Sequence, residues 1–158
     1  MITKEFLLDR YIYDDGRLLY RKNIGSGIAG QEVGTFDRDG YKRTTINRKP
    51  YRIHRLIFMM HYGYIPKILD HIDKNPNNNK IENIRIATHS QNNSNRGMHK
   101  RNVSGYKGVA FLKDRNLYRA KLVVDKKQVY MKTFKTAEEA YKAYCNASKQ
   151  FCKEFSRT

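Results

Sequence analysis

The sequence has few cysteines. It contains two, Cys145 and Cys152, both in a stretch with helical spacing. Residues seven positions apart on a helix lie about 10 Å apart, which is too far for a disulfide. No Cys-x-x-Cys pair is present, which argues against a zinc knuckle. Free thiols are typical of proteins in a reducing compartment.

The sequence also lacks a long apolar run. No stretch approaches the roughly 20 apolar residues that a membrane-spanning helix needs, and the N-terminus has no signal-peptide pattern. We therefore expect a protein of the cytoplasm of the cell that makes it, with no membrane partner.

Acidic residues are scarce. The 158 residues include 15 Asp and Glu against 32 Lys and Arg, a formal net charge of +17. The excess is spread over both halves and is larger after Asn95. Such a charge indicates partners rather than fold, and nucleic acid is the leading partner because dispersed Lys and Arg release counterions from phosphates. A ribosomal or merely soluble basic protein is the alternative. The length allows one ordinary domain or two small ones.

The first part of the chain predicts short strands and turns. Asp15-Gly16 and Asp39-Gly40 each lie between apolar or aromatic runs, which is a strong hairpin signal, and residues 47–50 predict another turn. Basic and apolar positions alternate along these strands. They form either a solvated sheet face or a ribbon along a DNA groove, and the pattern favours neither.

A helix is predicted next. Its apolar stripe has the spacing i, i+3, i+4 and i+7, and Gly63 is a plausible stop. The stripe comprises Ile53, Leu56, Ile57 and Met60. His54 and His61 lie off this stripe, and we expect both to be structural.

Residues 67–73 and 84–86 predict two short strands, with the turn-rich loop 74–80 between them. Thr88 and Gln91 have the spacing of a capping box, so a helix that carries Asn92 begins there.

After a polar and basic linker at 97–103, the pattern predicts three strands, 106–111, 117–124 and 128–134. Thr136 and Glu139 form a second capping box. A helical stripe follows, which we expect to pack on the sheet: Ala140, Tyr141, Tyr144, Ala147, Phe151 and Phe155. The fold class is therefore α+β.

The segment from Leu69 to Arg85, closed by Gln91-Asn92, resembles the signature of the HNH endonucleases. It has an Asp-His pair, a loop, an Asn before a hydrophobic-Arg strand, and an Asn on the next helix. Upstream, His54-Arg55 is similar to the His-Arg helix of phage and intron-encoded members. The resemblance implies a ββα-metal nuclease module and cleavage of double-stranded DNA by a phage-type homing endonuclease, acting in the host cytoplasm if a phage encodes it.

The resemblance also implies the roles of individual residues. His71 is the general base. Asp70 and Asn92 are ligands of Mg²⁺ or Mn²⁺, which prefer oxygen donors, and Asn83 ties the loop together and holds the histidine. Adjacent residues on an ideal strand face opposite sides, so Asp70 and His71 reach one site only if the strand ends or distorts there.

Two further residues near this signature have lesser expected roles. Asp73 is expected to form a turn rather than to bind metal, and Arg85 is expected to contact phosphate.

Residues 104–156 resemble the DNA-binding domain of plant ethylene-response factors, also called the AP-two domain. The matching segments are Ser104–Val109, Tyr118–Lys121, Phe134–Ala140 and Ala143-Tyr144. The resemblance implies a three-stranded antiparallel sheet packed on one helix, with the sheet in the major groove. Tyr118 stands where the plant domains usually have Trp, and Lys132 where glycine is common. The basic residues expected to contact DNA are Lys107, Lys113, Arg115, Arg119, Lys121 and Lys132.

We therefore expect a nuclease domain at 1–96, a linker at 97–103 and a DNA-binding domain at 104–158. The protein is expected to be a monomer or weak dimer without an obligate protein partner. Two alternatives stay open: a non-catalytic DNA-binding regulator with a vestigial nuclease module, and an RNA-binding or ribosome-associated protein.

Overall fold

The computed structural model describes residues 2–95, 98, 102–152 and 155–156. The chain divides into two compact units, Met1–Ile86 and Ala87–Thr158, and each has its own hydrophobic core. This division falls before the expected boundary and places α3 (His89–Asn95), which contacts β9 (Leu117–Val124), in the second unit. Most of the expected linker at 97–103 lies outside the described residues, so the domain boundaries stay a prediction. Within the described residues, no helix is both long and apolar enough to cross a membrane.

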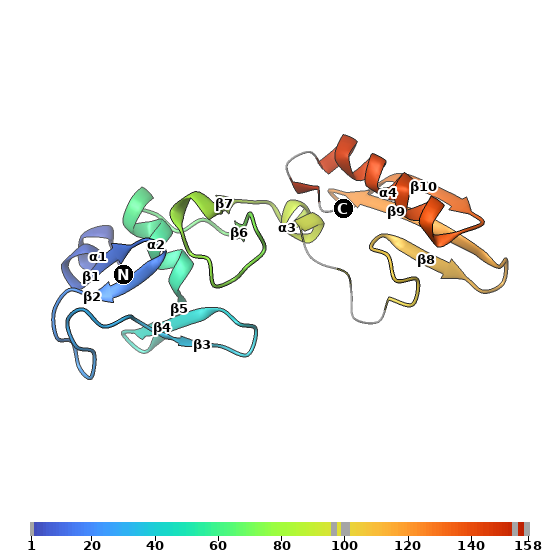
Figure 1. Cartoon of the computed structure of the whole chain (residues 1–158). Helices are drawn as coiled ribbons and strands as arrows, with labels where there is room; N and C mark the ends of the chain where they lie inside the picture. The colour runs from blue at the N-terminus through green and yellow to red at the C-terminus, as the bar shows by residue number, and fades with distance from the viewer. Residues whose placement is uncertain (1, 96–97, 99–101, 153–154, 157–158) are drawn as a thin grey trace. The chain divides into compact units, whose positions relative to one another are not determined.

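The first unit is a mixed α/β unit with three small antiparallel sheets, ordered β1-β2, β3-β4-β5 and β6-β7 (Figure 1). Its elements in chain order are α1 (Lys4–Arg10), β1 (Tyr11–Asp14), β2 (Arg17–Tyr20), β3 (Thr35–Phe36), β4 (Lys42–Ile46), β5 (Lys49–Arg52), α2 (Ile53–Tyr62), β6 (Leu69–His71), the 3₁₀ helix η1 (Ile81–Asn83) and β7 (Ile84–Ile86).

The predicted β1–β2 hairpin is confirmed. Asp15 and Gly16 have φ angles of 44° and 89°, as a two-residue turn that matches the strand twist requires. The predicted turn at residues 47–50 is also present, but it is shorter. Asn47 and Arg48 form it with φ angles of 50° and 63°, and Pro50 already belongs to β5.

The first ten residues differ from the prediction, which placed only strands and turns in this part of the chain. They contain the seven-residue helix α1, capped where the Oγ1 of Thr3 accepts a hydrogen bond from the backbone N–H of Phe6 (3.1 Å). Leu7 is its one fully buried side chain, and α1 packs on α2. A helix this short depends on tertiary packing rather than on its own propensity.

The predicted helix beginning at Ile53 is α2, and Gly63 ends it in the left-handed conformation with a φ of 81°. Every residue of α2 from Ile53 to Met60 is buried except Arg55. The helix is therefore the centre of the first core, and Leu7, Leu18, Val33 and Ile84 are buried in the same cluster.

The second unit contains α3, β8 (Val109–Leu112), β9, β10 (Lys127–Phe134) and α4 (Ala137–Cys152) (Figure 1). Its three strands form an antiparallel sheet in the order β10-β9-β8. α4 packs on one face of this sheet, where Ala140 and Tyr144 are buried in one cluster with Ala120 and Leu122.

Both predicted capping boxes form reciprocal hydrogen bonds, Thr88 with Gln91 and Thr136 with Glu139. One expected core residue of α4 is not buried, because the side chain of Phe151 is 43% exposed.

Candidate active site

Asp70 and His71 are adjacent on β6, and each is only 6% exposed. In the β6–β7 ladder, Asp70 lies opposite Arg85 and His71 lies opposite Ile84. The Nε and Nη2 atoms of Arg85 both lie 3.0 Å from the Oδ2 of Asp70. The buried carboxylate of Asp70 therefore has a guanidinium counter-charge supplied by the partner strand.

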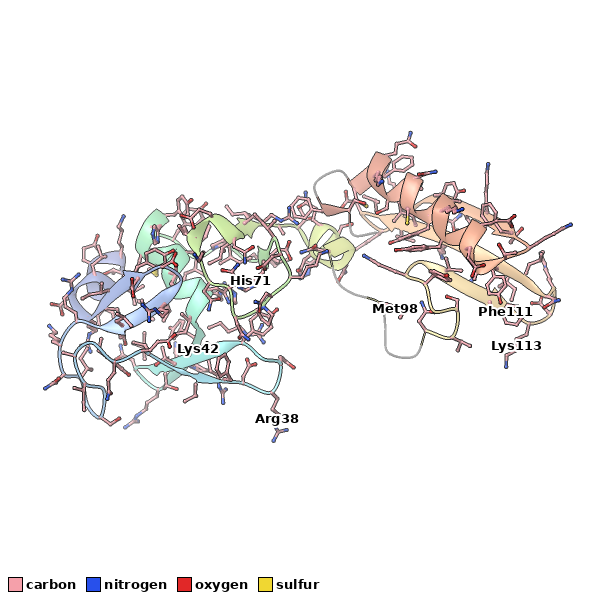
Figure 2. All side chains as sticks on the ribbon, viewed as in Figure 1. Arg38, Lys42, His71, Met98, Phe111 and Lys113 are labelled. Carbon is pink, nitrogen blue, oxygen red and sulfur yellow. The ribbon has the colours of Figure 1, made fainter. Side chains whose placement is uncertain are left out.

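The imidazole of His71 lies in a cluster of aromatic and amide groups from three other segments. Its Nε2 is 3.1 Å from the Oδ1 of Asn79, which is itself 4% exposed. The ring of His54 on α2 stands edge-on at 4.9 Å between centroids, and the ring of Tyr41 lies at 5.9 Å. Figure 2 labels His71 within the first unit. Asn79 and Tyr41 were not among the residues predicted to belong to this site.

His54 is 5% exposed, and within the described residues its Nδ1 has no hydrogen-bond partner. Burial lowers the pKa of His54 to about 3, and the electrostatic effects of the neighbouring His71, Arg52 and Arg55 act in the same direction. His54 is therefore a neutral ring, packed between α2 and His71.

The neighbouring Arg55 holds the chain that leads into β6. Its guanidinium donates hydrogen bonds to the backbone carbonyls of Pro66 (2.8 Å) and Lys67 (3.5 Å). The His54-Arg55 pair thus contacts the β6 region at two points, with one side chain against the His71 ring and the other on the backbone before Leu69.

Asn83 ties the Asn-rich loop together. Its Oδ1 accepts a hydrogen bond from the backbone N–H of Asp73 (3.0 Å), and its Nδ2 donates to the Oδ1 of Asp73 (2.9 Å) and to the carbonyl of Asn78 (2.7 Å). The carbonyl of Asn83 also accepts from the N–H of Ile72 (2.9 Å). These contacts join both ends of the loop directly after His71.

Asp73 serves as the anchor of that loop. Burial raises the pKa of its carboxyl, but hydrogen bonds from Asn78, Asn75 and Asn83 outweigh burial, and the net pKa is lowered. The carboxylate is therefore engaged in turn contacts, which is the role expected for it.

The β1–β2 turn supports the loop from the other side. Gly16 lies so close to the backbone that an added Cβ would be 2.8 Å from the N of Lys80 and 3.1 Å from the carbonyl carbon of Asn79. Lys80 forms an ion pair with Asp15 at 2.8 Å, and the hydroxyl of Tyr13 accepts a hydrogen bond from the N–H of Ile81 (3.1 Å). The N-terminal hairpin thus fixes the segment that carries Asn79.

Asn92, the second predicted metal ligand, lies on α3 and belongs to the second unit. The structure therefore places Asp70, His71 and Asn83 in the first unit and Asn92 in the second. Among the described residues, no group of three or more His, Cys, Asp or Glu is arranged to hold a metal ion. The donor chemistry still fits a hard cation, because Asp70 and Asn92 supply a carboxylate and an amide oxygen.

The basic residues of the second unit do not share one face. Arg119 and Lys121 alternate on β9 with the buried Ala120 and Leu122, so they lie on the face away from α4. Lys132 pairs across the ladder with Ala120, and it therefore lies on the face that carries α4.

The remaining predicted contacts of this unit flank the strands. Lys113 and Arg115 are exposed in the β8–β9 turn, and Figure 2 shows Lys113 projecting from it. Lys107 precedes β8. Within the described residues, the buried Nε of Arg119 has no hydrogen-bond partner.

Comparison with known proteins identifies the class of this chain. The family model described as HNH endonuclease matches residues 51–94, the segment that contains His54, Asp70, His71, Asn79 and Asn83. The chain belongs to the HNH endonuclease family.

Two viral proteins are similar to this chain. "Protein 3.8" of Escherichia phage T7 is 37% identical over 82 residues, which cover 51% of this chain and 68% of that protein. "Uncharacterized HNH endonuclease L560" of Acanthamoeba polyphaga mimivirus is 33% identical over 108 residues, 66% of this chain and 55% of that protein. No solved structure matches the chain significantly.

Proposed function

We propose that this protein is a metal-dependent endonuclease that hydrolyses phosphodiester bonds of double-stranded DNA. The observation that carries the proposal is the buried imidazole of His71, bonded to Asn79 and adjacent to the charge-paired Asp70. These residues lie within the segment that matches the HNH endonuclease family. The viral relatives favour a phage-type enzyme, and we propose that it is a homing endonuclease that acts as a monomer or weak dimer.

In this mechanism His71 accepts the proton of the attacking water. An imidazole can hold a proton or release it near neutral pH, which suits it to general-base catalysis. Asn83 keeps the loop after His71 closed through its bonds to Asp73 and Asn78. Cleavage of the bond to the 3′ oxygen leaves a 5′-phosphate and a 3′-hydroxyl.

Asp70 and Asn92 would hold a divalent cation, Mg²⁺ or Mn²⁺, through oxygen atoms. A bound cation acts as a Lewis acid at the phosphate and stabilises charge on the leaving oxygen. Arg85 holds the carboxylate of Asp70 in place through their ion pair. A guanidinium has five N–H donors, so Arg85 can also donate to a phosphate of the substrate.

The second unit would act as a DNA-binding module similar to the ethylene-response-factor domain. Arg119 and Lys121 share one face of its sheet, and we propose them as the main contacts to bases and phosphates. The other proposed contacts are Lys107, Lys113 and Arg115, which flank the strands, and Lys132 on β10. Binding by this module raises the effective concentration of the nuclease unit at its target, and the net charge of +17 favours both units on DNA.

The experiment is cleavage of supercoiled plasmid and phage genomic DNA by the purified chain, with Mg²⁺ and with excess EDTA, followed by mapping of the ends. We expect cleavage only with the cation. His71→Ala should lose nearly all cleavage and keep its affinity for DNA in an anisotropy titration, whereas His61→Ala should still cleave. Cleavage by His71→Ala at the wild-type rate would overturn the assignment of the base.

One observation favours the second candidate, a DNA-binding regulator with a vestigial nuclease module. The carboxylate of Asp70 already has Arg85 as its counter-charge, so this site does not require a cation for charge balance. The same assay separates the two candidates, because a regulator binds the DNA and cleaves none of it at any concentration of Mg²⁺ or Mn²⁺.

A further inference from the structure

We propose that Asn79 is a positioning residue that fixes which nitrogen of His71 takes the proton. This inference rests on the proposed function, because it assigns the atom that acts as the base. The Nε2 of His71 lies 3.1 Å from the Oδ1 of Asn79. An amide oxygen can only accept, so the hydrogen of this bond belongs to Nε2.

The assignment of Nε2 determines the state of the other nitrogen. A neutral imidazole carries one N–H and one lone pair. With the hydrogen on Nε2, the lone pair is on Nδ1, and Nδ1 is the atom that removes the proton from water. A histidine with the opposite tautomer would present an N–H to the water and could not act as its base.

Asn79 is buried although it lies in a loop. Its neighbours in the Asn-rich loop include the exposed Asn77, yet Asn79 is 4% exposed. The backbone of Asn79 and Lys80 lies against Gly16, and Lys80 is ion-paired with Asp15. The β1–β2 turn thus packs on the backbone of the loop, and the side-chain amide of Asn79 contacts the imidazole of His71.

The rings around His71 restrict its rotation. His54 stands edge-on to it at an interplanar angle of 73°, and Tyr41 lies on a second side at 45°. Arg52 stacks over the ring of Tyr41 at 3.8 Å and is ion-paired with Asp39 at 3.3 Å. Rotation of the imidazole by half a turn, which would exchange Nδ1 with Cδ2 and Nε2 with Cε1 and so remove Nε2 from Asn79, would have to displace these packed rings.

From the resemblance to the family, Asn83 was expected to hold the histidine in place. The side-chain hydrogen bonds described for Asn83 run to Asp73 and Asn78. Asn83 therefore acts on the loop as a whole, and Asn79 contacts the ring itself.

The test is a long-range ¹H–¹⁵N correlation spectrum of the full chain labelled at its histidines, at a pH where His71 is neutral. In the wild type we expect the proton of His71 on Nε2, protected from exchange with water. Asn79→Asp keeps an acceptor and should keep this proton. Asn79→Ala should lose its protection, whereas Asn77→Ala in the same loop should match the wild type.

Cleavage gives the second measurement. Loss of a group that orients a functional histidine typically lowers activity about 10- to 100-fold, so we expect such a loss for Asn79→Ala and none for Asn77→Ala. A wild-type spectrum with the proton on Nδ1 would overturn the proposal even if Asn79→Ala fails to fold. The spectrum can be read in a protein that cleaves nothing, so failure of the proposed function and failure of this assignment are distinguishable.

Discussion

Asp70 and Arg85 lie opposite each other on β6 and β7 and form an ion pair that is almost entirely buried, with side chains 6% and 15% exposed. A carboxylate so far removed from water needs a counter-charge. Arg85 therefore has a structural role in the candidate active site, in addition to the contact with DNA phosphate that is proposed for it.

Replacement of Arg85 by alanine should destabilise the first unit by about 3 kcal/mol, because it removes one partner of a buried pair. The measurement is urea unfolding followed by the NMR resonances of β6 and β7. Arg17→Ala is the matched control, since Arg17 pairs with Asp14 on the exposed hairpin, where a pair contributes about 0–1 kcal/mol. Equal losses in the two variants would contradict this account of Arg85.

On the second unit, a prediction follows from the two faces of the sheet. Arg119 and Lys121 lie on the face away from α4, and Lys132 lies on the other. Arg119→Ala with Lys121→Ala should weaken binding to duplex DNA about 10- to 100-fold and lower the slope of log affinity against log salt by about 2.

Lys142→Ala with Lys149→Ala removes the same charge from the exposed side of α4 and is the control for that pair of substitutions. A general electrostatic attraction would make the two double variants equally weak, whereas a binding face makes the first variant the weaker. Anisotropy titrations at several salt concentrations measure both quantities.

The stability of the first unit should depend on pH through His54. Burial lowers the pKa of His54 to about 3 from an ordinary value of 6.5. Between these two values the unfolded chain binds a proton that the native state does not, so stability is complete above pH 6.5 and falls as the pH falls. The expected slope is about 1.4 kcal/mol per pH unit.

His54→Phe should remove this slope between pH 4.5 and 6.5, where the lowered pKa of Asp73 has no effect. The variant also places no polar atom at the site of the unpartnered Nδ1, so at neutral pH it should unfold at a urea concentration close to that of the wild type. Parallel curves of unfolding free energy against pH for the two proteins would rule out His54 as the source.

Local signals in the sequence predicted much of the fold. The Asp15-Gly16 turn, the end of α2 at Gly63 and the Thr88–Gln91 capping box each depend on residues close in sequence, whose φ angles or hydrogen bonds are set locally. α1 was not predicted because it is stabilised by packing on α2, and no local sequence pattern shows that contact.

The Asp-His pair and the loop could be predicted from the sequence by resemblance, but the neighbours of His71 could not. Asn79 is one of three consecutive asparagines, and it differs from the others only because the distant β1–β2 turn packs on its backbone. The pairing of Asp70 with Arg85 depends on the register that the 12 residues between β6 and β7 allow. Both contacts join residues that are far apart in the sequence, so the residue types alone do not predict them.

That long-range contact supplies the last prediction. Gly16→Ala places a Cβ 2.8 Å from the backbone N of Lys80, so the Asn79-Lys80 segment has to move. Gly30→Ala is the matched control, because Gly30 has a similar φ of 82° and nothing within 4 Å of an added Cβ. Both variants strain a left-handed residue at a cost of about 1–2 kcal/mol, and only Gly16→Ala shifts the loop.

We therefore expect Gly16→Ala to lower cleavage about tenfold or more and to alter the imidazole signals of His71, while Gly30→Ala lowers stability and leaves both unchanged. The comparison is made at equal folded fractions, so a difference in stability does not contribute to the difference in cleavage between the two variants. If the two variants cleave equally, the N-terminal hairpin contributes to folding alone. A loss confined to Gly16→Ala means that the hairpin turn controls the geometry at His71 through the backbone of Asn79.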